Sequence, residues 1–163
     1  MRVLGIDPGL GRCGWGIVAK IGDRDSLKVI DYGCVETDAG LPLGERLLDL
    51  YAQLSTVCTQ YSPTSCALET LFFSSNTKTA MMVSRASGVI YLVAMQNGLS
   101  ITEYTPSQIK IAVTGYGSAD KKQMETMVTR LLGLSEVPTP DDTADALAIA
   151  LCHAVSSPHV TPA

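Results

Sequence analysis

The 163-residue sequence has few charged and few aromatic residues, which make up 17% and 6% of the chain. An average globular protein has about 25% charged residues, so charge is scarce here. Disorder is nevertheless excluded, because 46% of the residues are hydrophobic. The length fits one domain of ordinary size with a full core and is too short for most two-domain architectures.

The five cysteines show neither a metal-binding nor a disulfide pattern. No two of them are spaced as C-x-x-C, and their number is odd. This argues against a zinc site and against a disulfide framework. Most of them stand in apolar or strand-like segments, and we interpret these as small core residues.

Features of export and of membrane insertion are also missing. The longest apolar stretch, Gly88–Met95, is far too short to cross a membrane. The first residues lack the length and polarity pattern of a signal peptide, because Asp7 and Pro8 interrupt them early. We therefore expect a cytoplasmic protein that does not bind membranes.

Positive charge is scarce and unevenly distributed. The formal net charge of −4 argues at first against a nucleic-acid partner, because a duplex is bound mainly through Lys and Arg on its phosphates. Residues 131–163 contain four acidic residues and no Lys or Arg, whereas residues 72–130 contain six Lys or Arg and three acidic residues. The middle of the chain is thus a basic block between two acidic ones, which either reflects chance scatter or indicates where an anionic partner binds.

The spacing of apolar residues predicts three strands followed by alternating helices and strands. Short aliphatic and β-branched runs predict strands, and apolar residues at helical spacing predict helices. The expected strands are Arg2–Asp7, Gly14–Lys20, Leu27–Thr37, Ser65–Leu68 and Leu99–Tyr104. The expected helices are Leu43–Tyr61, Asn76–Asn97, Pro106–Val113, Asp120–Leu132 and Asp141–Val155. This order predicts one α/β domain with a mixed sheet over residues 1–155 and a flexible tail over residues 156–163.

The predicted helix Asn76–Asn97 is apolar around most of its circumference, with Met81, Val89, Leu92 and Met95 on different sides. A helix of this kind is buried on several sides. It could be a central core helix in a monomer, or it could pack one face on the sheet and another on a second copy of the chain. Since a small domain buries a helix on every side only with difficulty, we favour a homodimer through this helix.

Four acidic residues stand where a charge is energetically unfavourable. Asp7 and Glu69 each end an apolar strand, and Asp142 and Asp145 are spaced i, i+3 on an otherwise apolar helix, so they share a face. α/β folds gather their sites at the carboxyl ends of parallel strands. Carboxylates brought together raise one another's pKa, and hard cations such as Mg²⁺ and Mn²⁺ bind such oxygens. Two ions about 3.5–4 Å apart support in-line displacement at a phosphate.

These positions also have ordinary structural explanations. Asp7 could open the Asp-Pro-Gly turn, and Asp141 or Asp142 could cap the final helix. Periodicity allows Asp141 to share a face with Asp145 as easily as Asp142 does. Gly9–Gly14 matches G-x-G-x-x-G, but a dinucleotide site needs that loop to open a helix, and a strand follows it here. The similar phosphate loop of actin-like ATPases requires a second domain, for which 163 residues are too few.

Four short motifs follow one another along the chain: LGIDPG at Leu4–Gly9, ALETLF at Ala67–Phe72, GYGSADK at Gly115–Lys121 and DTADALAIA at Asp142–Ala150. Any one of them is weak, but together they resemble the RuvC family of bacterial crossover junction endodeoxyribonucleases, the Holliday junction resolvases. The resemblance implies an RNase H-like fold, a mixed five-stranded β-sheet flanked by α-helices. The alternatives are another RNase H-like nuclease, of the YqgF type or one that cuts other branched DNA or RNA, and a non-catalytic junction-binding protein.

The resemblance also implies an activity. It implies paired, symmetric nicks in two strands of like polarity of a four-way DNA junction, leaving 5′-phosphate and 3′-hydroxyl ends. Two Mg²⁺ ions per site, replaceable by Mn²⁺, would be bound by the catalytic residues Asp7, Glu69, Asp142 and Asp145. Asp141 is then interpreted as the helix cap. The implied partners are junction DNA, a second copy of the chain and the RuvA–RuvB branch-migration complex.

Candidate DNA contacts come from the basic middle of the chain. By the same resemblance, Phe72 matches a position near the junction centre, where an aromatic ring stacks on an unpaired base. Lys110 and Lys121 match basic positions near the active site, and a helix start at Lys121 would add backbone N–H groups for a phosphate. Lys122 is a further candidate phosphate contact. His153 has no matching catalytic partner and is expected at a helix end.

Overall fold

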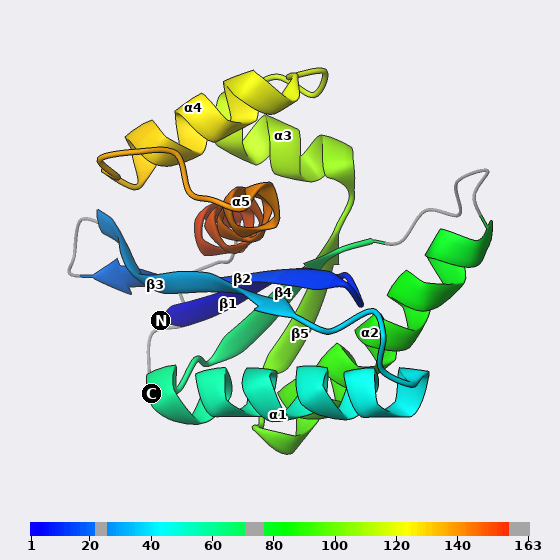
Figure 1. Cartoon of the computed structure of the whole chain (residues 1–163). Helices are drawn as coiled ribbons and strands as arrows, with labels where there is room; N and C mark the ends of the chain where they lie inside the picture. Colours follow the sequence, from blue (N-terminus) through cyan, green and yellow to red (C-terminus); the bar gives the residue numbers. More distant parts are fainter. Residues whose placement is uncertain (22–25, 71–76, 157–163) are drawn as a thin grey trace.

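A computed structural model describes residues 1–21, 26–70 and 77–156 of the chain (Figure 1). In these segments five strands form one mixed sheet in the order β3-β2-β1-β4-β5. Strand β1 pairs antiparallel with β2 and parallel with β4, so the sheet joins an antiparallel meander to a parallel half. The strands are β1 (Arg2–Asp7), β2 (Arg12–Ile21), β3 (Ser26–Glu36), β4 (Ser65–Glu69) and β5 (Ser100–Tyr104).

Helices cover both faces of the sheet. On one face lie α1 (Leu43–Tyr61) and α2 (Thr77–Gln96); on the other α5 (Asp141–Ser156) lies against the strands, with α3 (Pro106–Thr114) and α4 (Lys121–Leu131) packed over it (Figure 1). The mixed five-stranded sheet flanked by helices that the sequence predicts is thus confirmed. No helix in the described segments is both long and apolar enough to span a lipid bilayer.

The sheet separates two apolar cores, which follow from the alternation of side chains along β1. Leu4 and Ile6 pack with Leu50 and Leu54 of α1, whereas Val3 points to the opposite face and packs with α5. Burying one such side chain stabilises the fold by about 1.5–3 kcal/mol. The core also contains four of the five cysteines, all of them free thiols, as expected: Cys13, Cys58, Cys66 and Cys152.

Helix α5 lies very close to the sheet because glycines lie beneath it. A Cβ atom at Gly5 would stand 2.2 Å from the carbonyl oxygen of Ala146, and one at Gly14 would stand 1.9 Å from that of Asp142. No side chain fits at either position, and glycine in a strand often marks such a close approach. The backbone of the first turn of α5 is therefore held directly against β2.

Helix α2 has a buried and an exposed apolar face. Ile90 and Val93 belong to the core between α1 and the sheet, whereas Met81, Leu92 and Met95 are exposed. The hydroxyl of Tyr91 donates to the Glu103 carboxylate (2.7 Å), which ties the helix to β5. One apolar face of the helix is therefore buried against the rest of the described chain, and the packing of its other face on a second copy stays a prediction.

Candidate active site

Two of the predicted acidic residues, Asp7 and Glu69, end neighbouring parallel strands. Ile6 and Leu68 are paired in the register of β1 and β4, and the two carboxylates follow them directly. The strands run in the same direction, so both side chains stand at the same edge of the sheet. Because each strand is an apolar run followed directly by an acidic residue, the two carboxylates lie at neighbouring strand ends.

The other two, Asp142 and Asp145, come from the first turns of α5. The β1–β2 ladder pairs Asp7 with Gly14, and the backbone of Gly14 lies against the carbonyl of Asp142. The close approach at Gly14 thus brings the start of α5 beside the ends of β1 and β4. We call Asp7, Glu69, Asp142 and Asp145 the carboxylate cluster.

The electrostatics show that these four carboxylates affect one another. Burial, reinforced by the charges of Asp145, Asp142 and Glu69, raises the pKa of Asp7 to about 7. The pKa of Glu69 is raised by burial and by Asp145, and that of Asp145 is raised by burial, against the effect of Lys121. The structure therefore places the charges of Glu69, Asp142 and Asp145 close enough to Asp7 to raise its pKa.

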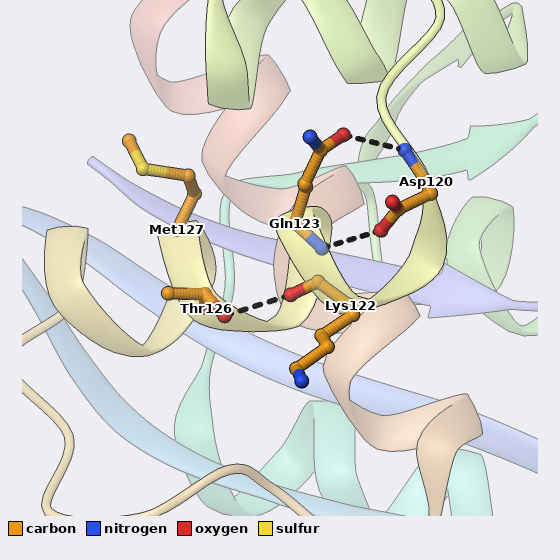
Figure 2. A pocket seen from close by; sticks show the side chains of 5 residues that line it. All are labelled: Asp120, Lys122, Gln123, Thr126 and Met127. Atoms are coloured by element: carbon orange, nitrogen blue, oxygen red, sulfur yellow. Dashed lines mark hydrogen bonds between the residues drawn. The ribbon is translucent and has the colours of Figure 1, made fainter.

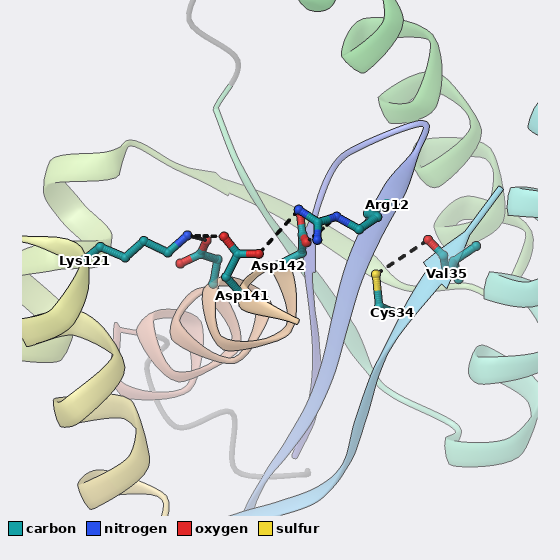
Figure 3. A network of polar contacts seen from close by, with 7 residues as sticks. Arg12, Cys34, Val35, Lys121, Asp141 and Asp142 are labelled. Carbon is teal, nitrogen blue, oxygen red and sulfur yellow. Dashed lines mark hydrogen bonds and ion pairs between the residues drawn. The ribbon is translucent and has the colours of Figure 1, made fainter. Parts of the chain in front are cut away.

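Two cations, Arg12 and Lys121, lie at the rim of the cluster. Nε of Arg12 lies 3.0 Å from the Asp142 carboxylate, and Nζ of Lys121 lies 3.7 Å from that of Asp145. Both cations also pair with Asp141, reaching it from opposite sides (Figure 3). We call Arg12 and Lys121 the rim cations.

Arg12 was not a candidate from the sequence alone. It is the first residue of β2, directly after the turn that follows β1, within the G-x-G-x-x-G pattern that we interpreted only as a loop. The hydroxyl of Thr37 donates to the carbonyl of Leu10 and accepts from Nε of Arg46 (3.0 Å), and the Thr37 N–H donates to Gly11 (3.0 Å). The turn next to Arg12 is therefore held in place by hydrogen bonds from Thr37. An arginine a few residues after a strand-ending Asp was the available signal.

The candidate DNA contacts lie at different distances from the cluster. Lys110 is half-buried on α3, and its charge opposes the rise in the pKa of Glu69. Lys121 begins α4 after Asp120, which caps the helix in a reciprocal pair of hydrogen bonds with Gln123 (2.8 and 2.9 Å; Figure 2). Phe72 lies outside the described residues.

Lys122 faces a different surface. It lines a pocket of about 350 Å³ whose walls come from α4 and its cap, and none of the carboxylate cluster contributes to it (Figure 2). The side chains that line it are those of Asp120, Lys122, Gln123, Thr126 and Met127.

One detail of the sequence interpretation is wrong. Asp141 is not the cap that precedes the final helix, because α5 begins at Asp141 itself and its carboxylate pairs with the rim cations. His153 lies in the last turn of α5, at the helix end that the sequence predicts, but it is not exposed there. It is 6% exposed, and its Nδ1 forms a 3.0 Å hydrogen bond with the hydroxyl of Tyr104. Both side chains find partners on elements far away in the sequence, which periodicity does not reveal.

The donor set of the cluster suits a hard divalent cation. Carboxylate oxygens are the ligands that Mg²⁺ and Mn²⁺ prefer. Oδ2 of Asp142 is buried and accepts no hydrogen bond from the described residues, although Arg12 Nε is 3.0 Å away. The described residues contain no group of three His, Cys, Asp or Glu side chains that closes around one point. Instead, Asp142 pairs with Arg12 and Asp145 with Lys121.

Comparison with known proteins decides the family. The model of the crossover junction endodeoxyribonuclease RuvC matches residues 3–153. This chain belongs to the RuvC family. It is 54% identical over 160 residues to the RuvC of Caldicellulosiruptor saccharolyticus, which covers 98% of this chain and 96% of the relative. The resemblance seen in the four motifs is therefore confirmed.

Solved structures agree with this family. Thermus thermophilus RuvC in complex with a Holliday junction substrate superposes with a TM-score of 0.89 at 37% identity, covering 94% of this chain and 93% of that one. The yeast mitochondrial Holliday junction resolvase superposes with a TM-score of 0.68 at 16% identity over 94% and 77% of the two chains, a likeness of fold alone. The RNase H-like fold expected from the sequence is confirmed, and RuvC membership makes the chain a metal-dependent crossover junction endodeoxyribonuclease.

Proposed function

We propose that this chain resolves Holliday junctions by paired, symmetric nicks in two strands of like polarity, leaving 5′-phosphate and 3′-hydroxyl ends. The observation that carries the proposal is the carboxylate cluster, in which three neighbouring carboxylates help to raise the pKa of Asp7 to about 7. Such a concentration of negative charge is unfavourable by itself and is tolerated where cations are bound. It lies in a chain of the RuvC family.

The four residues of the cluster are the proposed catalytic residues and the ligands of two Mg²⁺ ions, for which Mn²⁺ can substitute. When bound, such ions acidify the attacking water and stabilise the charge on the departing oxygen. Asp7 and Glu69, fixed at the strand ends, hold the rigid side of the site. Asp142 and Asp145, on α5, would hold the other side, next to the rim cations with which they pair.

Four residues of the basic middle are proposed to bind the DNA: Phe72, Lys110, Lys121 and Lys122. Lys110 and Lys121 are supported by their electrostatic interactions with Glu69 and Asp145, which place their charges beside the cluster. The N-terminus of α4 adds backbone N–H groups directed toward an anion. The argument for Phe72 rests on its position in the ALETLF motif.

The proposed assembly is a homodimer through α2, with one carboxylate cluster in each protomer. Its support is the exposed apolar face of α2, formed by Met81, Leu92 and Met95, because such faces pack against partners. We treat residues 1–155 as one nuclease domain and residues 156–163 as a tail, of which 157–163 lie outside the described residues. The family resemblance adds the RuvA–RuvB complex as a partner, and the sequence features described above favour the cytoplasm as the location.

Substrate choice tests the proposed function. The chain is incubated with a synthetic four-way junction, a linear duplex, a single strand and an RNA–DNA hybrid, each with Mg²⁺ and with EDTA. We expect cleavage of the junction alone, and only with Mg²⁺. Equal cutting of duplex or hybrid would indicate a general RNase H-like nuclease, and tight junction binding without any cutting would indicate a binding protein.

A further inference from the structure

Asp141 is a fifth carboxylate beside the cluster, and the proposed function gives it no role. Its side chain is 45% exposed, with Oδ1 3.5 Å from Nη2 of Arg12 and Oδ2 accepting a hydrogen bond from Nζ of Lys121 (Figure 3). Among the described residues it is the one carboxylate that pairs with both rim cations, since Asp142 pairs with Arg12 and Asp145 with Lys121.

The two rim cations come from separate elements and are open to solvent. Arg12 projects from the first residue of β2, next to the anchored turn, and is 51% exposed, and Lys121 projects from the start of α4 and is 53% exposed. They have no common element, yet their charged groups meet at the two oxygens of one carboxylate. This arrangement, a planar guanidinium and an ammonium sharing one anion, is also how proteins hold a phosphate.

We propose that Asp141 occupies, in the DNA-free chain, the place of a backbone phosphate between Arg12 and Lys121, and that bound DNA displaces it. Asp141 is then a positioning residue. It keeps both cations directed to one point at the rim of the cluster, and it competes with the phosphate that must take its place. The inference rests on the proposed function in taking DNA as the ligand.

The competition predicts that removing the charge of Asp141 tightens DNA binding. Binding of a fluorescent four-way junction and of a matched linear duplex is measured by anisotropy in EDTA, so that no cleavage occurs. Asp141→Asn keeps the shape and removes the charge, and we expect the Kd for both DNAs to fall about three- to tenfold, the size expected for two exposed ion pairs. Asp141→Ser, a second polar replacement without charge, is expected to give the same gain.

Two comparisons separate this exchange from a general effect of charge. Asp49→Asn removes the same charge on α1, on the opposite face of the sheet, where Asp49 accepts a hydrogen bond from Gln53 of the same helix (2.9 Å). We expect it to change the Kd less than about twofold. In a chain that carries Arg12→Ala and Lys121→Ala, Asp141→Asn should no longer tighten binding, because the cations that it frees are gone.

Unchanged or weaker binding by Asp141→Asn would overturn the inference. So would an equal gain from Asp49→Asn, or a full gain without the two cations. A wild-type chain that binds the junction no more tightly than the duplex would instead contradict the proposed function. The inference is still decided in that case, because the effect of Asp141→Asn is read on the duplex as well.

Discussion

Asp7 is the residue of the proposed site whose pKa is most clearly raised by its surroundings. It ends β1 and is largely buried, and the charges of Glu69, Asp142 and Asp145 raise its pKa, whereas that of Lys121 lowers it. A carboxyl group in this position is poorly suited to stabilising the fold and well suited to binding a cation. Its effects on catalysis and on stability can therefore be separated by experiment.

Asp7→Asn should abolish Mg²⁺-dependent cleavage while junction binding survives. Loss of one outer-sphere partner of a metal ligand already costs about 10–100-fold, so loss of a proposed ligand should lower the cleavage rate by at least about 100-fold. The rate is measured under single-turnover conditions and the Kd in EDTA. Normal turnover by this variant would remove Asp7 from the proposed site.

Asp7 should also make the metal-free protein less stable as the pH rises. In the folded chain its pKa is about 7, whereas its ordinary value is 3.8. Between these values the folded state holds a proton that the unfolded state has lost. The contribution of this proton is therefore complete below about pH 4 and is lost as the pH rises through about 7. The loss amounts to at most about 4 kcal/mol at pH 8.

Urea unfolding in EDTA at pH 5 and pH 8 measures this effect. The fall in unfolding free energy between the two pH values should be smaller for Asp7→Asn than for the wild-type chain, and Asp49→Asn should behave like the wild type. An identical fall in all three proteins would show that Asp7 is ionised without penalty in the fold.

At the residue scale, the sequence identifies charged residues that interrupt or end an apolar run. It does not identify residues whose partners lie on another helix or strand. Asp7 and Glu69 can be found because each ends a strand of hydrophobic residues. Arg12, Asp141 and His153 cannot be assigned in this way. Their partners lie on elements that are distant in the sequence, and single-sequence periodicity contains no information about such pairs.

At the scale of elements, the position of α5 depends on the glycines beneath it. Gly5 and Gly14 let the helix backbone approach the sheet, and this approach sets Asp142 beside Asp7. The helix itself is predictable from its apolar residues and acidic first turn. Its distance from the sheet is not, because a glycine in a strand is also read as a turn or a bulge.

Gly14→Ala should displace the start of α5. The added Cβ would meet the carbonyl oxygen of Asp142 at 1.9 Å, so the helix or the strand must shift. We expect a loss of about 1–3 kcal/mol in unfolding free energy, as for other overpacked cores, and a fall in the rate of junction cleavage.

Gly44→Ala is the matched control, because nothing lies within 4 Å of a Cβ at that position of α1. Helical alanine is favoured over glycine, so its stability should stay equal or rise by up to about 1 kcal/mol. Both values come from urea unfolding. Equal stability of Gly14→Ala and the wild-type chain would contradict the close approach of α5.

Element boundaries were predictable where the sequence contains a clear stop. The helix Leu43–Tyr61 is predicted with its observed bounds because Pro63 ends it. Strand β2 begins at Arg12, two residues earlier than predicted, because the glycines around Arg12 suggested a longer turn. Pairing of Arg12 with Glu36 in β3 extends the strand, and such pairing is a tertiary effect.

At the scale of the whole molecule, the net negative charge of the chain no longer argues against DNA binding. Four of the sixteen acidic residues form the carboxylate cluster, and two divalent cations would neutralise them. The six Lys and Arg of residues 72–130 include Lys110 and Lys121, whose charges act on the cluster. The protein is therefore expected to bind DNA with strong salt sensitivity.

The dimer proposal predicts a solution mass of twice 17.3 kDa by light scattering. Leu92→Glu, on the exposed face of α2, should lower the mass to that of one chain, because a charge in an apolar interface is unfavourable. Leu48→Glu introduces the same change at an exposed leucine of α1 and should leave the dimer intact. A wild-type monomer that still makes paired nicks would contradict the two-site account.

The most direct test of the central claim is the cutting of a supercoiled plasmid that extrudes a cruciform, a four-way junction within one molecule. With Mg²⁺, we predict linear product from two nicks at symmetric positions in strands of like polarity, with ends that ligase reseals. Asp7→Asn should leave the plasmid supercoiled. Nicked circles with single cuts at scattered positions, or linear product from Asp7→Asn, would contradict junction resolution by the carboxylate cluster.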